Sequence, residues 1–349
     1  TFIIYQQIHH AKSRDSGFDL QNVMMTDLSD DLKKNFTALK SELLEKGLVT
    51  SVTSATSIAT NVSWHSDLDN FPGKQGKETV EMGTIIVSED YFKTLGMKLS
   101  EGRDFVSGAD TTSVIFNEAA IKLLRLKDPL NQVIRWDNKD FRIAGVVKDA
   151  LMISPFEGAD PTMFMCSLTP LSNMMYRLAP GQDAQKTMAG LTAIFNKHNP
   201  AYPFMYEFQD ESYAAKFKVE LLIGKLAGIF ASLAIFISCL GLFGLSAYIV
   251  SNKTKEIGIR KVLGATIAQI WLMLSRDFIA LVVISCIIAS PIAYYFLHNW
   301  LQKYDYRITI GPWIFLIAGA ISLIIAILTV SVQAIKAAVA NPVKSIRTE

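Results

Sequence analysis

The sequence predicts an α-helical membrane protein with three transmembrane helices that carries an α+β domain outside the membrane. Three observations predict this fold class: uncharged apolar runs in the second half, basic residues concentrated between them, and short segments of helical and strand period in the first half. Half of the 349 residues are hydrophobic and only 19% are charged. This composition is more apolar than a soluble protein of such length needs.

The three apolar runs are long enough to cross a bilayer. Residues 227–250 contain no charge, and a helix of that length rises about 36 Å at roughly 1.5 Å per residue, more than a hydrocarbon core of about 30 Å requires. Residues 278–297 and 312–332 form two further uncharged runs of spanning length. We therefore predict three transmembrane helices over these ranges.

The loops around the runs predict the orientation. The first part of the connector between the first two runs, residues 251–266, carries four basic residues against Glu256, and the tail after the third run carries three against Glu349. The basic residues are Lys253, Lys255, Arg260 and Lys261, and then Lys336, Lys344 and Arg347. By the positive-inside rule both segments are cytoplasmic. The second connector, with Trp300, Tyr304 and Tyr306 as interfacial anchors, is then outside, as is everything before residue 227.

The outer part, residues 21–210, is predicted to be α+β. We expect two units of helix and strand at its ends. The first has a helix at 30–46 and a strand at 49–55, and the second has a strand at 173–178, a helix at 183–198 and a strand at 204–209. Between them an inserted subdomain, at about 57–170, holds short strands at 84–87, 113–116, 133–136 and 141–147 and a helix at 117–124. Its entry, residues 61–78, is polar and rich in glycine, which predicts an exposed, mobile loop.

Two flanking segments connect this domain to the membrane. Residues 1–20 begin with the apolar Phe2–Tyr5, which we interpret as the end of a truncated transmembrane helix followed by a linker. Residues 211–226 are compatible with a helix that continues into the first span, so we expect a stalk there.

Arrangements of residues that carry catalysis are missing from the sequence. The segment Gly73-Lys74-Gln75-Gly76-Lys77 has the wrong spacing for a phosphate-binding loop. His9 and His10 are adjacent, so they point to different sides of any regular element, and the three cysteines lie far apart. We expect no enzyme activity, cofactor, metal or nucleic-acid partner.

The first cytoplasmic connector is the most informative stretch. Apolar residues at helical spacing, namely Ile259, Val262, Leu263, Ile267, Ile270 and Leu274, predict one amphipathic helix along the membrane surface. Its charged side chains face the cytoplasm, where an ATPase could bind them. A basic helix that only anchors to anionic membrane lipid is the alternative.

A second candidate feature is a series of small residues on the first span. They are Gly224, Gly228, Ser232, Gly241 and Gly244. Such residues let membrane helices approach closely, so we expect packing against another permease helix. The alternative is that glycine is simply frequent in membrane helices. Charged residues are missing from the three runs, which argues against a proton or ion path.

The connector also resembles a known family signature. Its residues Lys255, Glu256, Ile257, Gly258, Ile259, Arg260, Lys261, Val262, Leu263 and Gly264 are similar to the signature of the FtsX/MacB family of ABC transporter permeases. The closing segment 340–349 resembles the tail of Bacteroidetes members of that family. Segments 87–97, 102–105, 116–120 and 145–149 are similar to the family's periplasmic domain. The resemblance covers nearly the whole chain.

The resemblance implies a structure and an assembly. The residues from Lys255 to Gly264 are then a coupling helix seated in a cleft of a separate ABC ATPase subunit, and the outer domain has a "porter" half with an inserted "sabre" half. Family members have four spans per unit, whereas this sequence has three, and segment 6–12 resembles the one after the fifth span of eight-span members. We therefore expect the C-terminal unit of a longer chain, in a bacterial inner membrane, paired with a second permease unit as a homodimer or a covalent tandem repeat.

The implied function is transport driven by a partner ATPase. Nucleotide-driven motion of the connector helix is expected to pass through the first span and stalk to the periplasm. The work there is export of peptides or drugs, or handling of lipoproteins or other envelope components, with a periplasmic adaptor or lipoprotein as a further candidate partner. The alternative is a membrane-anchored envelope sensor, or a regulator of a cell-wall enzyme, without transport.

Overall fold

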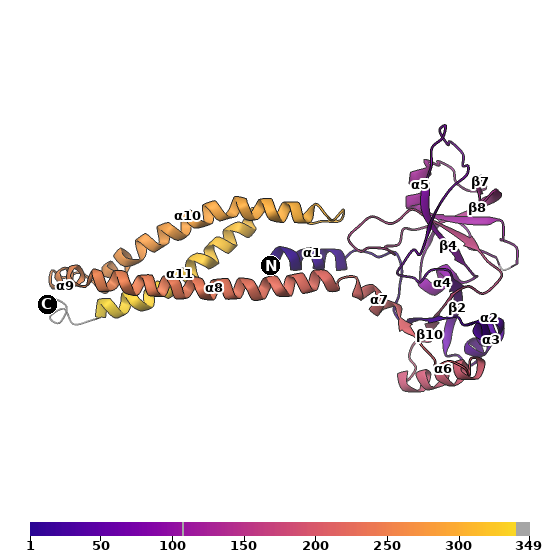
Figure 1. The fold of residues 1–349 in the computed structure, drawn as a ribbon, viewed down its shortest axis with the longest axis horizontal. Coiled ribbons are helices and arrows are strands. Elements are labelled where there is room, and N and C mark those ends of the chain that lie inside the picture. Colours follow the sequence, from indigo (N-terminus) through magenta and orange to yellow (C-terminus); the bar gives the residue numbers. More distant parts are fainter. Residues whose placement is uncertain (107, 340–349) are drawn as a thin grey trace. The chain divides into compact units, whose positions relative to one another are not determined.

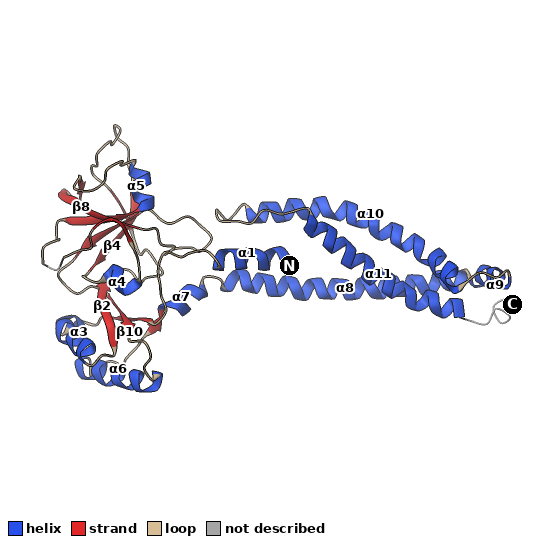
Figure 2. Cartoon of the chain, turned by 180° about the vertical axis from the view of Figure 1, so that it is seen from behind, coloured by secondary structure: helices blue, strands red, loops and turns tan. Residues whose placement is uncertain are grey.

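A computed structural model describes residues 1–106 and 108–339 of the chain. It contains two compact units, one formed by Thr1–His10 with the chain from Glu220 onward, the other by Ala11–Val219. The first is helical and the second holds all the strands of the described residues (Figures 1 and 2). The closing segment 340–349, which carries one of the resemblances, lies outside the described residues.

The helical unit contains the three predicted spans. Its helices are α1 (Phe2–Lys12), α8 (Lys218–Asn252), α9 (Thr254–Val262), α10 (Ile267–Leu301) and α11 (Trp313–Val339). Helices α8, α10 and α11 are long and apolar enough to cross a membrane, and each contains one of the predicted runs. The prediction of three spans is confirmed.

The second unit is built on one sheet of eleven strands. Along its main path the order is β11-β1-β10-β2-β4-β9-β6-β8-β5, while β3 pairs with β4 and β7 with β8. The strands are β1 (Val23–Asp27), β2 (Val49–Ala55), β3 (His65–Asp67), β4 (Glu81–Val87), β5 (Leu99–Gly102), β6 (Ser113–Asn117), β7 (Val133–Trp136), β8 (Lys139–Val147), β9 (Thr162–Cys166), β10 (Asn173–Leu178) and β11 (Glu207–Phe208). The helices of this unit are α2 (Asp30–Lys34), α3 (Phe36–Glu45), α4 (Tyr91–Leu95), α5 (Glu118–Leu124), α6 (Ala184–His198) and α7 (Gln209–Ala215).

The sheet has two halves that meet at a single residue pair. Strand β2 pairs with β4 only through Ala55 and Val87. Helices α3 and α6 pack on the half that ends in β2, and α5 packs on the half that begins with β4. The second half comes from the chain between β2 and β10, as an insertion requires.

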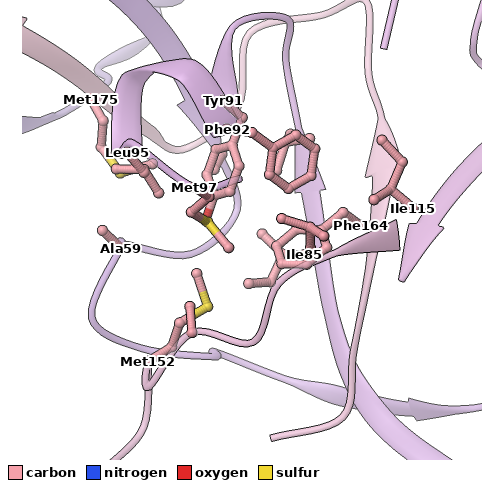
Figure 3. Packing of buried hydrophobic residues seen from close by; sticks show 14 of the residues in the cluster. Ala59, Ile85, Tyr91, Phe92, Leu95, Met97, Ile115, Met152, Phe164 and Met175 are labelled. Carbon is pink, nitrogen blue, oxygen red and sulfur yellow. The ribbon is translucent and has the colours of Figure 1, made fainter. Parts of the chain in front are cut away.

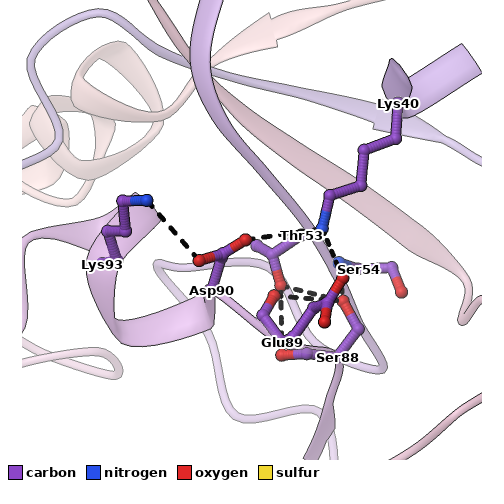
Figure 4. A network of polar contacts seen from close by, with 7 residues as sticks. All are labelled: Lys40, Thr53, Ser54, Ser88, Glu89, Asp90 and Lys93. Atoms are coloured by element: carbon purple, nitrogen blue, oxygen red, sulfur yellow. Dashed lines mark hydrogen bonds and ion pairs between the residues drawn. The ribbon is translucent and has the colours of Figure 1, made fainter. Parts of the chain in front are cut away.

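An apolar core and a polar network both join the halves. Figure 3 shows Tyr91 and Phe92 of α4 near Ile85 and Phe164 of the second half, and Leu95 of the same helix beside Met175 of the first half. In the polar network, Lys40 of α3 lies 2.8 Å from Glu89 and 3.4 Å from Asp90, and the Ser54 N–H donates to the Ser88 hydroxyl oxygen (Figure 4). The halves therefore share one hydrophobic interior.

The segment before residue 21 is part of the domain, so its interpretation as a linker is wrong. The Leu151 N–H donates to the Ser16 carbonyl oxygen at 2.8 Å, and the Asp19 N–H donates to the Leu95 carbonyl oxygen at 2.8 Å. Leu20 is buried in the core. Hydrogen bonds to residues far along the chain hold this segment in place, and the local sequence pattern does not indicate them.

Residues 61–78 also pack more closely than predicted. They contain β3, which pairs with β4, and Leu68 and Phe71 are buried in the core of the second half. His65 Nε2 lies 2.9 Å from an Asp160 carboxylate oxygen. Leu68 and Phe71 anchor this otherwise polar segment in the core. The prediction of an exposed loop is therefore wrong for the part up to Phe71.

The predicted helix at 30–46 is divided in the structure. Helix α2 ends before Asn35, whose φ of −95° and ψ of 8° interrupt the helical backbone, and α3 starts at Phe36. Asparagine is a weak helix former, and the Asn35 amide donates to the His198 carbonyl oxygen at 3.4 Å. The predicted strand at 204–209 shortens to Glu207–Phe208, because Phe204 stacks on Phe195 of α6 instead.

The stalk is not one continuous helix, contrary to the prediction for residues 211–226. Helix α7 ends at Ala215 and α8 begins at Lys218. The local sequence has no proline or glycine at this point, so tertiary contacts cause the break. The Lys216 ammonium donates to the Ile153 carbonyl oxygen at 2.7 Å, and Phe217 is buried against Phe156.

Glu42 makes the stability of the first half sensitive to acid. Its carboxylate accepts hydrogen bonds from Lys197 and His198 of α6, both at 2.9 Å. The hydrogen bonds from Lys197, His198 and Lys46 lower the pKa of Glu42 to about 2. A carboxyl whose pKa falls on folding stabilises the folded state above its unfolded pKa and loses that contribution as the pH falls toward the folded pKa.

We expect Glu42→Gln to lower the free energy of unfolding most above about pH 4.5. The difference from the wild type should shrink as the pH falls toward 2. Denaturant unfolding of both proteins at several pH values measures this, with the exposed Glu45→Gln as the matched control. A difference that stays constant over this range would show that the ion pairs of Glu42 do not set the pH dependence.

Candidate functional site

The predicted coupling segment forms a short helix followed by a tight turn. Helix α9 (Thr254–Val262) follows α8 after Lys253. It ends at Val262 with Leu263 as its C-cap, and Gly264 has a φ of +92°, a left-handed conformation that favours glycine. Thr266 then starts α10, because its hydroxyl accepts from the Gln269 N–H while the Gln269 side chain accepts from the Thr266 N–H.

This turn overturns the prediction of one amphipathic helix from Ile259 to Leu274. Of the six apolar residues predicted to share a face, only Ile270 and Leu274 are buried, and both belong to α10. Because the left-handed backbone of Gly264 separates the two helices, the helical period of α9 does not continue into α10. Two helices therefore present their apolar residues in different directions.

Helix α9 is anchored through Ile257. This side chain is 5% exposed and packs with Ile270 and Leu274 of α10 and Ala334 of α11. The adjacent Gly258 is buried too. A single short helix thus contacts the first turns of α10 and the last turns of α11.

Two hydrogen bonds near this core restrain the same helices. The Trp271 indole N–H donates to the Ser331 hydroxyl at 2.8 Å and joins α10 to α11. The Thr254 hydroxyl donates to the Val250 carbonyl oxygen at 2.9 Å and joins the start of α9 to the end of α8. The anchoring role of Ile257 and Trp271 escaped the sequence analysis. The interfacial preference of tryptophan is the one signal that could have indicated Trp271.

The opposite side of α9 is exposed and apolar. Ile259, Val262 and Leu263 are 55%, 68% and 80% exposed. Exposed apolar side chains that lie together on a surface are typical of an interaction site. We call these three residues the α9 apolar surface.

Charged side chains border the α9 apolar surface. Glu256 and Arg260 form an ion pair at 2.7 Å, one helical turn apart, with about half of each side chain exposed. Arg260 also contacts the Met273 sulfur at 2.7 Å, and Lys255 is exposed. Over residues 1–106 and 108–339 no group of three or more His, Cys, Asp or Glu could hold a metal ion. The arrangement is suited to binding a partner.

The small residues predicted to form a packing surface on the first span lie in two different environments. A Cβ at Gly224 would lie 3.4 Å from Ile4 and 3.5 Å from Tyr5, so this position packs against α1. A Cβ at Gly241 or Gly244 would meet no atom within 4 Å in the described part of the chain. The Ser232 hydroxyl donates to the Gly228 carbonyl oxygen within α8. Packing of Ser232, Gly241 and Gly244 against another permease helix stays a prediction.

The two units together define a multispanning membrane protein with a large α/β domain outside the bilayer. Two family models match the chain: the MacB-like periplasmic core domain over residues 7–194 and the FtsX-like permease C-terminal domain over residues 228–342. The first covers more than half of the chain. The protein belongs to this MacB/FtsX family of ABC transporter permeases, as its connector motif predicts.

Individual relatives are distant in sequence. The uncharacterized ABC transporter permease YknZ of Bacillus subtilis is 22% identical over 281 residues, which are 75% of this chain and 69% of that protein. The macrolide export ATP-binding/permease protein MacB of Chromobacterium violaceum is 23% identical over 362 residues, covering 99% of this chain. The chain spans about half of that relative, 52% of its length.

A solved structure is similar to the outer unit. It is the periplasmic region of MacB from Actinobacillus actinomycetemcomitans, with 15% sequence identity and a TM-score of 0.41 over 61% of this chain and 96% of that one. The match to the periplasmic core model confirms the predicted class of the outer domain. Three apolar helices with such a domain fit an inner-membrane protein with a periplasmic part.

Proposed function

We propose that this chain is the permease subunit of an ABC transporter and that a separate ATPase docks on the α9 apolar surface. One observation supports this most strongly: α9 is anchored to α10 and α11 through Ile257 while its opposite side stays exposed. A helix held in this way is rigid enough to receive a force and still free to bind. The relatives named MacB combine ATP-binding and permease parts in one protein, and the remaining half of such a relative is where the ATP-binding part would lie.

The chemistry of the surface suits a protein partner. Burial of Ile259, Val262 and Leu263 in an interface would contribute about 1.5–3 kcal/mol for each side chain that becomes fully buried. Lys255, Glu256 and Arg260 around them would fix the orientation of the partner, because charge complementarity sets register and specificity more than affinity.

The proposed mechanism carries motion from α9 to the periplasm. Since α9 shares a core with the ends of α10 and α11, closure of an ATPase dimer on α9 would move both helices together. The predicted spans carry no Asp, Glu, Lys or Arg, which favours work on the outer side of the membrane over an ion-coupled path through it. Export of peptides or drugs, or handling of lipoproteins, fits this scheme, and the MacB relatives are named for macrolide export.

A double substitution tests the docking. Glu256→Ala with Arg260→Ala removes both charges, and because exposed ion pairs in helices contribute only about 0.3–0.5 kcal/mol, the fold should be retained. We expect the variant to lose stimulation of the ATPase and to co-purify less of it from membranes. The exposed pair Arg135 and Asp140, replaced by Ala in the same way, is the matched control. Unchanged stimulation in the first variant, or no ATPase with the wild type, would favour the sensor class instead.

A further inference from the structure

The connector between α10 and α11, residues 302–312, is fastened to α1 by a buried glutamine. Gln7 has no exposed surface. Its side-chain amide N–H donates to the Tyr306 carbonyl oxygen at 2.8 Å, and its amide oxygen accepts from the Ile308 N–H at 2.9 Å. A primary amide presents an N–H donor and a carbonyl acceptor side by side, so it binds this stretch of main chain as a neighbouring strand would.

These two hydrogen bonds have no easy substitute. The connector has no regular secondary structure, so its main-chain groups need partners from elsewhere in the chain. A side chain without an amide at position 7 would leave the half-buried Tyr306 carbonyl and Ile308 N–H without these partners, and an unpaired group shielded from water destabilises the fold.

Aromatic contacts on both sides of Gln7 join the same elements. The His10 ring stacks on Tyr306 with centroids 4.3 Å apart and an interplanar angle of 4°. Phe2 meets Trp313, the first residue of α11, edge to face at 6.2 Å. The connector and the start of α11 therefore contact α1 near its start, middle and end.

The other side of α1 packs against α8. Ile4 and Tyr5 lie against Gly224, and Thr1 lies near Gly228. Ile3, Ile4 and Ile8 are buried. Helix α1 is thus held between α8 and the connector, with the polar contact on one side and the apolar contacts on the other.

We infer that Gln7 is the positioning residue that makes α1 follow the α10–α11 hairpin. The inference rests on the proposed function, in which α9 moves the hairpin from its other end. Motion of α10 and α11 would reach the connector, then Gln7, then α1, and the chain continues from Lys12 directly into the outer unit. The route along α8 is interrupted at Lys216 and Phe217, so α1 supplies a second connection that avoids this break.

The experiment measures the distance between α1 and the connector in the full chain with its ATPase in membranes. Spin labels are placed at the exposed His9 and Lys303 after Cys166, Cys239 and Cys286 are replaced by Ser. With Gln7 present, pulsed EPR should give one narrow distance distribution that is the same with and without ATP, because the two elements move together.

Two variants of Gln7 and one control complete the test. Gln7→Leu and Gln7→Met, which nearly keep the volume but cannot make the two hydrogen bonds, should both lose the narrow component. Gln6→Ala, at the neighbouring position, should retain it. A narrow distribution in both Gln7 variants would overturn the inference, and so would a wild-type distance that changes with ATP.

Failure of the proposed function would look different. In that case no ATPase would co-purify with the wild type, while the distance distribution measured without nucleotide would still respond to Gln7. Retained ATPase binding in Gln7→Leu, together with loss of the narrow component, is the result expected if both proposals hold.

Discussion

Leu263→Asp is expected to abolish binding and stimulation of the ATPase while the chain stays folded. Leu263 is 80% exposed in the isolated chain, so the substitution removes little packing. The acidic side chain at a helix C-terminus costs about 0.5 kcal/mol through the helix dipole. In the docked state, however, the carboxylate would be buried against an apolar surface, and the loss of a central contact of this kind costs at least about 2 kcal/mol, or roughly thirtyfold in affinity.

A matched control separates docking from a general effect of charge. Val339, the last residue of α11, is 62% exposed and is also at a helix C-terminus. Val339→Asp should leave ATPase binding near the wild-type value. Co-purification of the ATPase and its rate in membranes are measured for both variants. Equal ATPase binding by Leu263→Asp and the wild type would exclude the α9 apolar surface as the docking site.

Gly17→Ala is expected to produce the largest loss of stability in the outer unit. Gly17 has a φ of +79°, and a Cβ there would lie 1.9 Å from the Asp149 carbonyl oxygen. The backbone of 15–19 or of 149–150 would have to move, which would strain the hydrogen bond between Leu151 and Ser16. We expect a destabilisation of about 4 kcal/mol or more, which lowers the midpoint of thermal unfolding by about 10 °C.

Gly47 provides the control for this substitution. It also has a positive φ, +63°, but a Cβ there would meet nothing within 4 Å in the described residues. Gly47→Ala should therefore cost only the backbone strain of about 1–2 kcal/mol. Thermal unfolding of the full-length variants in detergent, followed by proteolysis of the outer unit, measures both. Similar midpoints for the two variants would show that the contact of Gly17 with Asp149 is not a close one.

The spans could be predicted because their signal is local. An uncharged run of spanning length between basic loops is typical of a transmembrane helix, and all three runs lie in long helices. The helices predicted at 183–198 and 117–124 form within one residue of these starts, where Asp183 and Asn117 cap α6 and α5. In these elements local sequence and tertiary structure agree.

Several strands and one helix escaped prediction because packing defines them. Strands β1 and β9 are rich in methionine, which has no strong preference for strands, and only their pairing in the sheet reveals them. Helix α4 follows Asp90, which has a φ of 64° and no side-chain cap. Its four buried residues, rather than a start signal, hold it in place.

Only part of the candidate site could be predicted from the sequence. The motif singled out a segment that the permease family model includes, and its role in coupling stays a prediction. Which side of α9 is buried could not be read from the spacing, because Gly264 ends the helix and Ile257, rather than Ile259, contacts α10 and α11. The contact of Gln7 with residues 306 and 308 joins positions about three hundred residues apart, so no local pattern indicates it.

We propose that the α9 apolar surface faces the cytoplasm and contacts an ATP-hydrolysing subunit. A photo-reactive residue at position 263, with a cysteine at the exposed Leu168 to mark the outer unit, tests this proposal in intact cells. We expect a crosslink from position 263 to the ATPase and labelling of position 168 by a membrane-impermeant reagent from outside. Labelling of a cysteine at position 263 by the same external reagent, without any crosslink to an ATPase, would contradict it.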